Sequence, residues 1–472
     1  MAEDITDEFA AVDLMDKRCD RRLGRVAAAM AKHPAASISA ATGGWRETIG
    51  ALRLLHRGKT TPAALLAPHQ QCVVERCAQY ACVTVSQDTT ELDFTHMREL
   101  EGLGPLNSET RRGFYLHTLY AGSEDGLPLG LLDMAMLARD DETFRGTDTR
   151  KQRPIEEKES RRWLDGYLKT QELARRLPAC EVFSISDREG DIFEVYGAWQ
   201  RSAAGPGPCA HWIIRANQDR ALLGMENGEP AKLFAALAAA PGLGEIQFEM
   251  NSRRGMKKVK GSNVTTFRSA RTVHQVVRAM EITPRPPWRK DMQLEQVSCW
   301  AMLAEETNPP AGEEPIRWLL LTSKKVTSLE DARRIMNLYL RRWDIEVFHR
   351  VLKTGCRVER IQLKTIAAVM NAITLYAVIA WRILYLTHLG RRHPDLPCGC
   401  VFEEAEWKGA CAVVNRDPHA PEPSMAEFMG IVGKLGGHLG RKSDGPPGPQ
   451  SIWRGLTRVR DFALAWKAYY GE

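Results

Sequence analysis

Hydrophobic residues in the first 75 positions recur at helical spacing. Asp20 to Lys32, Thr48 to Leu55 and Pro62 to Cys72 each place apolar residues on one side of a helix, and Asp20 is a candidate N-cap. We therefore expect residues 1–75 to form a small helical bundle.

Short runs of β-branched and apolar residues replace this spacing from Ala81 onward. Ala81 to Asp88 predicts a strand. Phe114 to Ala121 and Leu127 to Ala138 predict a hairpin, because the residues between them include the turn-forming pair Asp125-Gly126.

Helices and strands then alternate along the chain. A charged helix from Ile155 to Leu177 precedes an apolar strand that ends at Asp187, a helix from about Asp191 and a strand from His211 to Arg215. Hairpin strands followed by alternating helix and strand predict an α/β fold with a mixed sheet flanked by helices.

Helical periodicity fades between about 220 and 315, where we expect a β-rich insertion. Ile316 to Thr322 resumes as a core strand, and Ser328 is expected to cap one long helix that ends near Lys353. Thr365 to Leu389 predicts a second long helix that is mostly apolar, and further helices are expected after it.

Composition places the chain among soluble multidomain proteins. Its 472 residues, 44% hydrophobic and 26% charged, exclude collagen-like, disulfide-scaffold and wholly disordered proteins. The acidic N-terminus lacks the features of a signal peptide, and we expect no membrane-spanning stretch, so a cytoplasmic location follows. Eleven cysteines favour reduced thiols. A zinc site near Cys398 and Cys400 is disfavoured because their spacing lacks two well-separated pairs.

Basic residues concentrate in two segments of a chain whose net charge is only +6. Residues 17–59 hold ten Lys and Arg against two acids, and residues 251–290 hold eleven against one. Solvated basic faces are the alternative explanation. Two separate segments nevertheless favour a polyanion such as nucleic acid, held at two places.

Three acidic residues are candidate ligands for metal-assisted chemistry. Asp88 and Asp187 each end a predicted strand, where a carboxylate is held on rigid backbone and can face a cleft. The third, Glu346, shares one narrow face of the predicted helix with three residues that recur at helical spacing: Tyr339, Arg342 and Lys353. Periodicity alone would also fit a surface ladder of weak ion pairs.

Three motifs around these residues resemble a known family, the DDE cut-and-paste transposases of the insertion-sequence-four group: Asp88-Thr89-Thr90, Asp187-Arg188-Glu189-Gly190-Asp191 and Tyr339-(2)-Arg342-(3)-Glu346-(6)-Lys353. The resemblance extends over nearly the whole chain through further segments: Glu157 to Ser160, Asn308 to Pro310, Trp318 to Ser323, and Leu435 to Gly437 with Trp453 near the end.

The resemblance implies a DNA transposase with a ribonuclease-H-like core. Asp88, Asp187 and Glu346 would be the catalytic residues and would hold two Mg²⁺ ions, for which Mn²⁺ could substitute. The implied reaction is nicking at the transposon ends, hairpin formation and opening, and strand transfer into target DNA. His349 fits a packing or DNA-facing role better than that of a base or ligand.

The same resemblance implies a set of DNA contacts. Trp318 would stack beside a flipped base, and Tyr339, Arg342 and Lys353 would bind phosphates near it. Arg215 resembles a further DNA-contacting arginine. Without the resemblance, Trp318 would be read as a core residue of a strand, and Arg215 as a partner of a nearby acid.

Three domains follow from the pattern and the resemblance. We expect a helical DNA-binding domain at 1–75 for the terminal repeats, a catalytic domain at 76–385 with the β-rich insertion, and a helical dimerisation domain at 386–472. The partners would be double-stranded DNA, as transposon ends and target, and a second copy of the chain.

Two other functions stay open at this point. One is a catalytically silent DNA-binding relative, against which the intact acids and the basic N-terminal bundle argue. The other is a sequence-tolerant ribonuclease-H-like nuclease, which would need the acids but not Trp318 or the cations of the tetrad.

Overall fold

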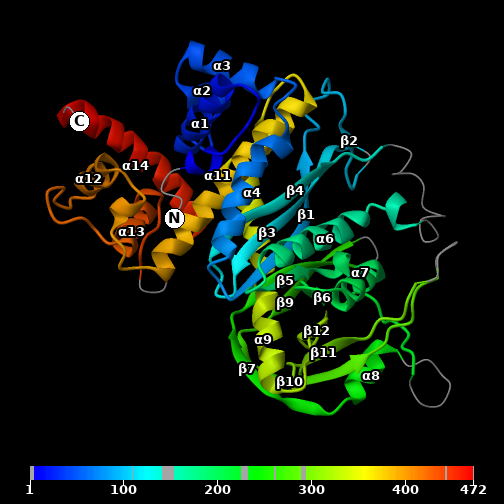
Figure 1. The fold of residues 1–472 in the computed structure, drawn as a ribbon. Coiled ribbons are helices and arrows are strands. Elements are labelled where there is room, and N and C mark those ends of the chain that lie inside the picture. Colours follow the sequence, from blue (N-terminus) through cyan, green and yellow to red (C-terminus); the bar gives the residue numbers. More distant parts are fainter. Residues whose placement is uncertain are drawn as a thin grey trace. The chain divides into compact units, whose positions relative to one another are not determined.

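The computed structural model describes residues 5–108, 110–140, 154–224, 232–259, 262–288, 294–441 and 444–470. The chain divides into two compact units, Met1–Thr147 with Trp343–Glu472, and Asp148–Arg342. Both units contain β-strands flanked by helices (Figure 1). The expected α/β class, with a mixed sheet and flanking helices, is confirmed.

The first unit begins with the expected helices: α1 (Lys17–Lys32), α2 (Ile38–Thr42), α3 (Trp45–Leu55) and α4 (Pro62–Cys77). The expected N-cap of α1 is wrong, because the helix begins earlier. Asp16, not Asp20, accepts the capping hydrogen bond from the backbone N–H of Arg18. Asp20 lies in the first turn, where a negative charge favours the helix N-terminus.

The sheet of the first unit is antiparallel and centred on β3. It contains four strands: β1 (Cys82–Asp93), β2 (Gly104–Pro105), β3 (Arg112–Ser123) and β4 (Pro128–Leu137). The expected hairpin of β3 and β4 is confirmed. In its turn Gly126 adopts a φ of +91°, which favours glycine, and the Ser123 hydroxyl accepts from the backbone N–H of Leu127.

Helix α11 (Ile366–Arg392) is the central helix of the first unit and packs with α4 on β4 (Figure 1). The sequence predicted no segment that could span a membrane. By length and composition alone, this helix is long and apolar enough to cross one. However, 78% of its most apolar 18-residue window is buried inside the structure. Three helices follow it: α12 (Glu404–Val413), α13 (Met425–Leu435) and α14 (Pro449–Tyr470).

The second unit is built on a mixed sheet in the order β5-β6-β12-β11-β10-β7. Its first two strands, β5 (Glu181–Ser186) and β6 (His211–Arg215), are parallel, and the other pairs are antiparallel. The helices that accompany the strands include α6 (Arg161–Arg176), α7 (Phe193–Ala204) and α8 (Leu233–Ala239). Helix α7 lies between β5 and β6 in the chain, because neighbouring parallel strands need a crossover connection, which is usually a helix.

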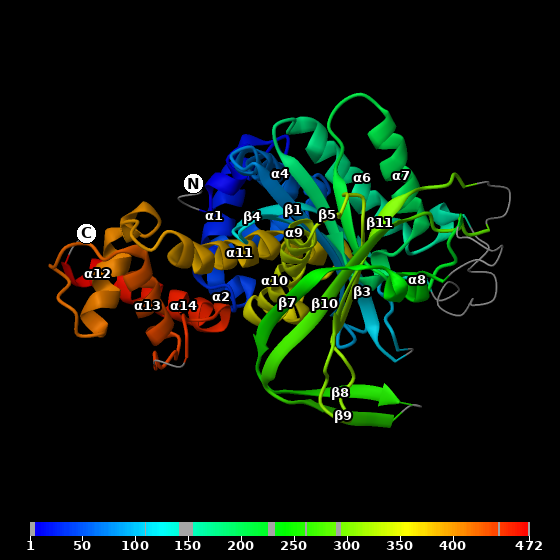
Figure 2. The same cartoon turned by 90° about the horizontal axis from the view of Figure 1, so that it is seen from below.

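Strands dominate the stretch where a β-rich insertion was expected: β7 (Gly242–Met250), β8 (Arg253–Val259), β9 (Ser262–Arg268), β10 (Arg271–Ile282) and β11 (Cys299–Glu306). The following strand, β12 (Arg317–Thr322), matches the expected core strand. Figure 2 shows β8 and β9 as a two-stranded arm beyond β7 and β10. The arm carries part of the second basic segment.

The long helix expected from Ser328 to Lys353 is divided, which corrects the prediction of one continuous face. Ser328 does cap α9 (Leu329–Leu340), in a capping box with Asp331. At Arg341 and Arg342 the backbone N–H groups bond to carbonyls three residues earlier, so the turn tightens before α10 (Trp343–Arg350) begins. A π-helical turn, Val351–Gly355, follows α10.

Candidate active site

Asp88 lies inside β1 rather than at its end, which corrects the expected strand boundary. Pairing with β3 continues from Val83 through Asp93, and Asp88 stands opposite Thr118. The strand extends because the residues after Asp88 have a full set of backbone partners on β3. One carboxylate oxygen of Asp88 accepts from the backbone N–H of Thr89 at 2.8 Å, and the residue is half-buried.

Helix α10, which carries Glu346 and His349, packs on β1. His349 is buried, with its Nε2 3.2 Å from the Thr118 hydroxyl and its Nδ1 3.9 Å from the Asp88 carboxylate. Burial lowers the pKa of His349 to about 3. The imidazole is therefore neutral at pH 7 and packs beneath Asp88, which agrees with a packing role.

Lys353 also contacts β1. Its ammonium donates to the Glu91 carbonyl at 2.8 Å and lies 3.3 Å from the Glu359 carboxylate. Glu91 is three residues beyond Asp88 on the same strand. These contacts hold the Lys353 stem near the strand that carries Asp88.

The second unit gathers its predicted site residues at one edge of its sheet. Asp187 directly follows β5, and Arg215 ends the parallel neighbour β6, so both lie at the carboxyl edge of these strands. β12 runs antiparallel to β6 with Leu320 opposite Arg215, which brings Trp318 to the same edge. Asp187 fits the expected position after its strand.

Tyr339, at the end of α9, faces this edge. The ring centroids of Trp318 and Tyr339 are 5.9 Å apart, with planes at 73°. Burial raises the pKa of the Tyr339 phenol and Asp187 adds to this, while the guanidinium groups of Arg342 and Arg215 oppose it. A carboxylate, a phenol, two guanidinium groups and an indole therefore lie together, which is a set suited to phosphates beside a base.

Burial and the neighbouring Arg188 lower the pKa of Arg215. The Tyr339 phenol and the Asp187 carboxylate partly oppose this lowering. Such a half-buried guanidinium remains charged at pH 7, because an ordinary arginine pKa lies far above that value. It is therefore a stable cation at the sheet edge.

The three predicted metal ligands are divided between the units. Asp88 and Glu346 belong to the first, and Asp187 belongs to the second. Within the described residues no group of three or more His, Cys, Asp or Glu side chains is arranged to hold a metal ion. The three acids are half-buried carboxylates on or beside regular elements, and oxygen donors suit Mg²⁺ or Mn²⁺. Their assignment as ligands stays a prediction.

The N-terminal helices present a basic, open surface. α2 and α3 are joined by Gly43 and Gly44, and Gly43 has a φ of +70°, so a tight turn sets the two helices at an angle. α3 buries Ala51, Leu54 and Leu55, and its opposite face carries exposed side chains that include Trp45, Arg46, Arg53 and His56. Trp45 is 81% exposed.

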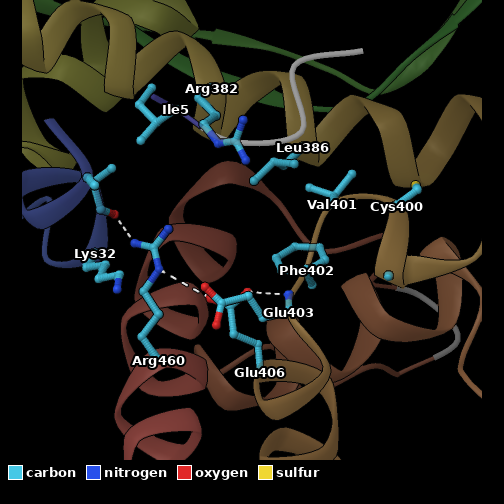
Figure 3. Close-up of a pocket in the computed structure, with 13 residues that line it drawn as sticks. Ile5, Lys32, Arg382, Leu386, Cys400, Val401, Phe402, Glu403, Glu406 and Arg460 are labelled. Atoms are coloured by element: carbon cyan, nitrogen blue, oxygen red, sulfur yellow. Dashed lines mark hydrogen bonds and ion pairs between the residues drawn. The ribbon is translucent and has the colours of Figure 1, made fainter. Parts of the chain in front are cut away.

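A polar pocket of about 380 Å³ opens in the first unit between α1, α11, α12 and α14 (Figure 3). Arg460 of α14 donates to the Ala31 carbonyl in the last turn of α1 and lies 3.6 Å from Glu406 of α12. A cation is favourable at a helix C-terminus, so Arg460 joins α1 to the C-terminal helices. Lys32 and Arg382 also line this pocket.

The sequence reasoning missed Thr118 and Asp191. Thr118 meets His349 only through strand pairing, for which its own sequence position gives no signal. Asp191 is buried with several hydrogen-bond donors around it. Its place at the end of the Asp-Arg-Glu-Gly-Asp motif could have singled it out.

Three family models match the chain. A transposase DNA-binding model matches residues 1–59, a transposase DDE domain model matches residues 206–382, and a transposase Tn5 dimerisation domain model matches residues 378–470. The DDE match contains Glu346 and all the predicted DNA-contacting residues, whereas Asp88 and Asp187 lie outside the three matched segments. The matches stand in the order that the motifs indicated. The chain therefore belongs to the DDE transposases related to the Tn5 transposase, which are dimer-forming, divalent-metal-dependent enzymes with a ribonuclease-H-like core that cut and join DNA.

Proposed function

We propose that this transposase performs cut-and-paste transposition, with Asp88, Asp187 and Glu346 as ligands of two Mg²⁺ ions. The observation that carries the proposal is the cluster of Asp187 with Arg215, Trp318 and Tyr339 at one sheet edge. A simple nuclease needs carboxylates but has no need of an indole and a phenol beside them. Bound metal ions would activate the attacking oxygen and stabilise the leaving oxygen.

The proposed sequence consists of phosphoryl transfers. Water attacks the phosphodiester at the transposon end, the bond to the 3′ oxygen breaks, and a 3′-hydroxyl is released on the element. That hydroxyl attacks the opposite strand, which forms a hairpin and frees the flanking DNA. A second water opens the hairpin, and the restored 3′-hydroxyl attacks target DNA. In each step a water or hydroxyl oxygen bonds to phosphorus and a 3′ oxygen leaves as a hydroxyl, so one site can serve all of them.

The side chains around Asp187 would orient the DNA through these steps. Arg215 and Arg342 offer forked donors to phosphate oxygens, and the Tyr339 hydroxyl is a neutral donor. Lys353 would supply a further ammonium. Trp318 would stack against a base displaced from the helix, which relieves the distortion of a hairpin.

The remaining regions would supply the partners. Residues 1–75 would bind the terminal repeats through the open face of α3, because the first residues of a helix after a tight turn can reach base edges in the major groove. Residues 386–472 would form the homodimer in the DNA complex. A cytoplasmic location suits a reaction on chromosomal DNA.

Cleavage of native end DNA tests the proposal. Duplexes made from the DNA that flanks the coding sequence are incubated with protein and Mg²⁺, and strand products are resolved on denaturing gels. We expect a nick, then a hairpin, from the wild type and binding without cleavage from Asp187→Asn. Equal cleavage by the two proteins would refute the metal-site assignment, and nicks without hairpins would favour a simple nuclease.

A further inference from the structure

The Asp191 carboxylate is a buried hub of hydrogen bonds in the second unit. Only 3% of the residue is exposed. One oxygen accepts from the Tyr196 hydroxyl and from Arg220 Nη2, the latter at 2.6 Å. The other accepts from the backbone N–H groups of Asn217 and Gln218, at 2.8 and 3.3 Å. Burying a carboxylate is costly unless its oxygens are satisfied, and here each oxygen has two donors.

Asp191 ends the turn that Asp187 begins. The residues between them form one 3₁₀ turn, closed by bonds from Gly190 N–H to the Asp187 carbonyl and from Asp191 N–H to the Arg188 carbonyl. The turn lies tight on β5, because a Cβ at Gly190 would stand 2.2 Å from the Ser186 hydroxyl. A movement of Asp191 would therefore be transmitted to Asp187.

The donors on the other side belong to the loop after β6. Asn217 and Gln218 follow Arg215 by two and three residues, and Ala216 N–H bonds to the Leu319 carbonyl of β12. Since β5 and β6 are parallel neighbours, both chain segments leave the sheet at the same edge. The Asp191 carboxylate thus joins the Asp187 turn to the loop that directly follows Arg215.

We propose that Asp191 is a positioning residue, which holds the Asp187 carboxylate and the Arg215 guanidinium in register at the sheet edge. The inference rests on the proposed roles of Asp187 and Arg215. Asp191 itself is buried behind the edge and contacts no substrate. Its charge is neutralised by Arg220, whose guanidinium also donates to the Asp191 carbonyl at 2.8 Å.

An amide at this position would break the register. In Asp191→Asn one oxygen becomes an NH₂ group, which would face either the Tyr196 and Arg220 donors or the two backbone donors. Against the two backbone groups it would make two donor–donor contacts. Against the other pair it would make one, with Arg220, because the Tyr196 hydroxyl can also accept. Either contact is costly in a buried site, so we expect the loop and the turn to separate. Tyr196→Phe is a milder change, because it removes one donor and keeps the ring stacked on Trp212.

DNA affinity measured without divalent metal tests the proposal, because the positioning role and the simple loss of a charge predict changes of opposite direction. Removing a buried negative charge would by itself leave DNA affinity unchanged or raise it. Misplacing Arg215 would lower affinity, and the slope of log Kd against log salt would fall by about 1. We expect Asp191→Asn to show that loss, measured by fluorescence anisotropy on flanking-DNA duplexes, and to cut Mg²⁺-dependent nicking by about a hundredfold.

Asp219→Asn is the matched control. It removes the same charge from the same loop, but its carboxylate accepts from Phe234 N–H and has no contact with Asp191. We expect its affinity and nicking to match the wild type. Thermal unfolding of each protein shows whether it folds, and Tyr196→Phe, which should show a smaller loss of the same sign, tests the proposal if Asp191→Asn does not fold.

Asp187→Asn and Arg215→Ala in the same assays distinguish failure of the positioning role from failure of the proposed function. If both lose their expected functions while folded Asp191→Asn and Tyr196→Phe bind and cut as the wild type does, the positioning role is wrong and the proposed function stands. If Asp187→Asn cuts normally and Arg215→Ala binds normally, the proposed function fails, and the positioning role fails with it.

Discussion

The indole of Trp318 lies edge-on to the phenol of Tyr339, with ring centroids 5.9 Å apart. Trp318 belongs to β12 and Tyr339 to α9, so the contact joins a strand and a helix at the sheet edge that also carries Asp187. Trp318 is only half-buried, which leaves part of the indole free to stack on a base.

Trp318→Ala should therefore separate two steps of the reaction. We expect the first nick to stay near the wild-type rate and hairpin formation to fall by about tenfold or more, since base stacking contributes about 1–3 kcal/mol. Trp318→Phe keeps an aromatic face and should recover part of the hairpin rate. Equal losses of nick and hairpin in Trp318→Ala would instead make it a core residue.

The exposed face of α3 should set DNA affinity. Trp45→Ala and Arg46→Ala remove exposed side chains, so the unfolding temperature should change little while affinity for flanking-DNA duplexes falls by about 1–3 kcal/mol. Arg416→Ala removes a similar charge from a surface pair with Glu427. If Arg416→Ala lowered affinity as much as Arg46→Ala, the arginine effect would be one of net charge alone, and unchanged affinity in Trp45→Ala would contradict a role for this face.

Glu8 should anchor the N-terminal segment. Its buried carboxylate contacts His69 Nδ1 at 2.5 Å and Arg76 at 2.7 Å, and His69 Nε2 accepts from Leu131 N–H. Burial opposes ionisation of Glu8, but His69 and Arg76 outweigh it and lower its pKa to about 2. Glu8→Ala should reduce the free energy of unfolding by about 3–5 kcal/mol, measured by chemical denaturation.

Glu181→Ala provides the comparison for Glu8. Glu181 also forms ion pairs with two basic side chains, Lys324 and Arg334, but a quarter of its own side chain is exposed. Its loss should cost about 1 kcal/mol or less. If the Glu8 variant were no less stable than the Glu181 variant, the buried network would not anchor the segment.

His211 should make stability fall as the pH drops below neutral. Burial and Lys324 lower the pKa of His211 to about 4, against about 6.5 in the unfolded chain. The unfolded state thus binds the proton first, and stability is lost as pH falls from 6.5 toward 4. Between pH 7 and 5, His211→Gln should lose on the order of 1–2 kcal/mol less than the wild type. Parallel pH profiles would contradict this.

Sequence patterns found the elements whose signals are local. The β3–β4 hairpin follows from Asp125-Gly126, the strand His211–Arg215 from its apolar run, and the start of α9 from its Ser328 cap. They could not place the end of β1, because pairing with β3 carries the strand five residues past Asp88.

The sequence predicted which residues belong to the candidate site, but not how they are arranged in space. The spacing of Tyr339, Arg342 and Glu346 suggested a single helix, yet a tightened turn at Arg342 separates α9 from α10. Periodicity cannot detect such a turn, because the residues within it are ordinary helix formers. The partners of Asp191 were likewise hidden, since three of its four donors, Asn217, Gln218 and Arg220, follow a different strand.

Metal binding to the DNA complex tests the central claim most directly. Mn²⁺ is titrated calorimetrically into the wild type bound to flanking-DNA duplex, and into complexes of Asp88→Asn, Asp187→Asn and Glu346→Gln, with Asp344→Asn of the same helix as control. We predict two ions for the wild type and the control, and the loss of at least one ion in each of the other variants. Two ions bound with unchanged affinity by all five proteins would contradict the assignment of these carboxylates.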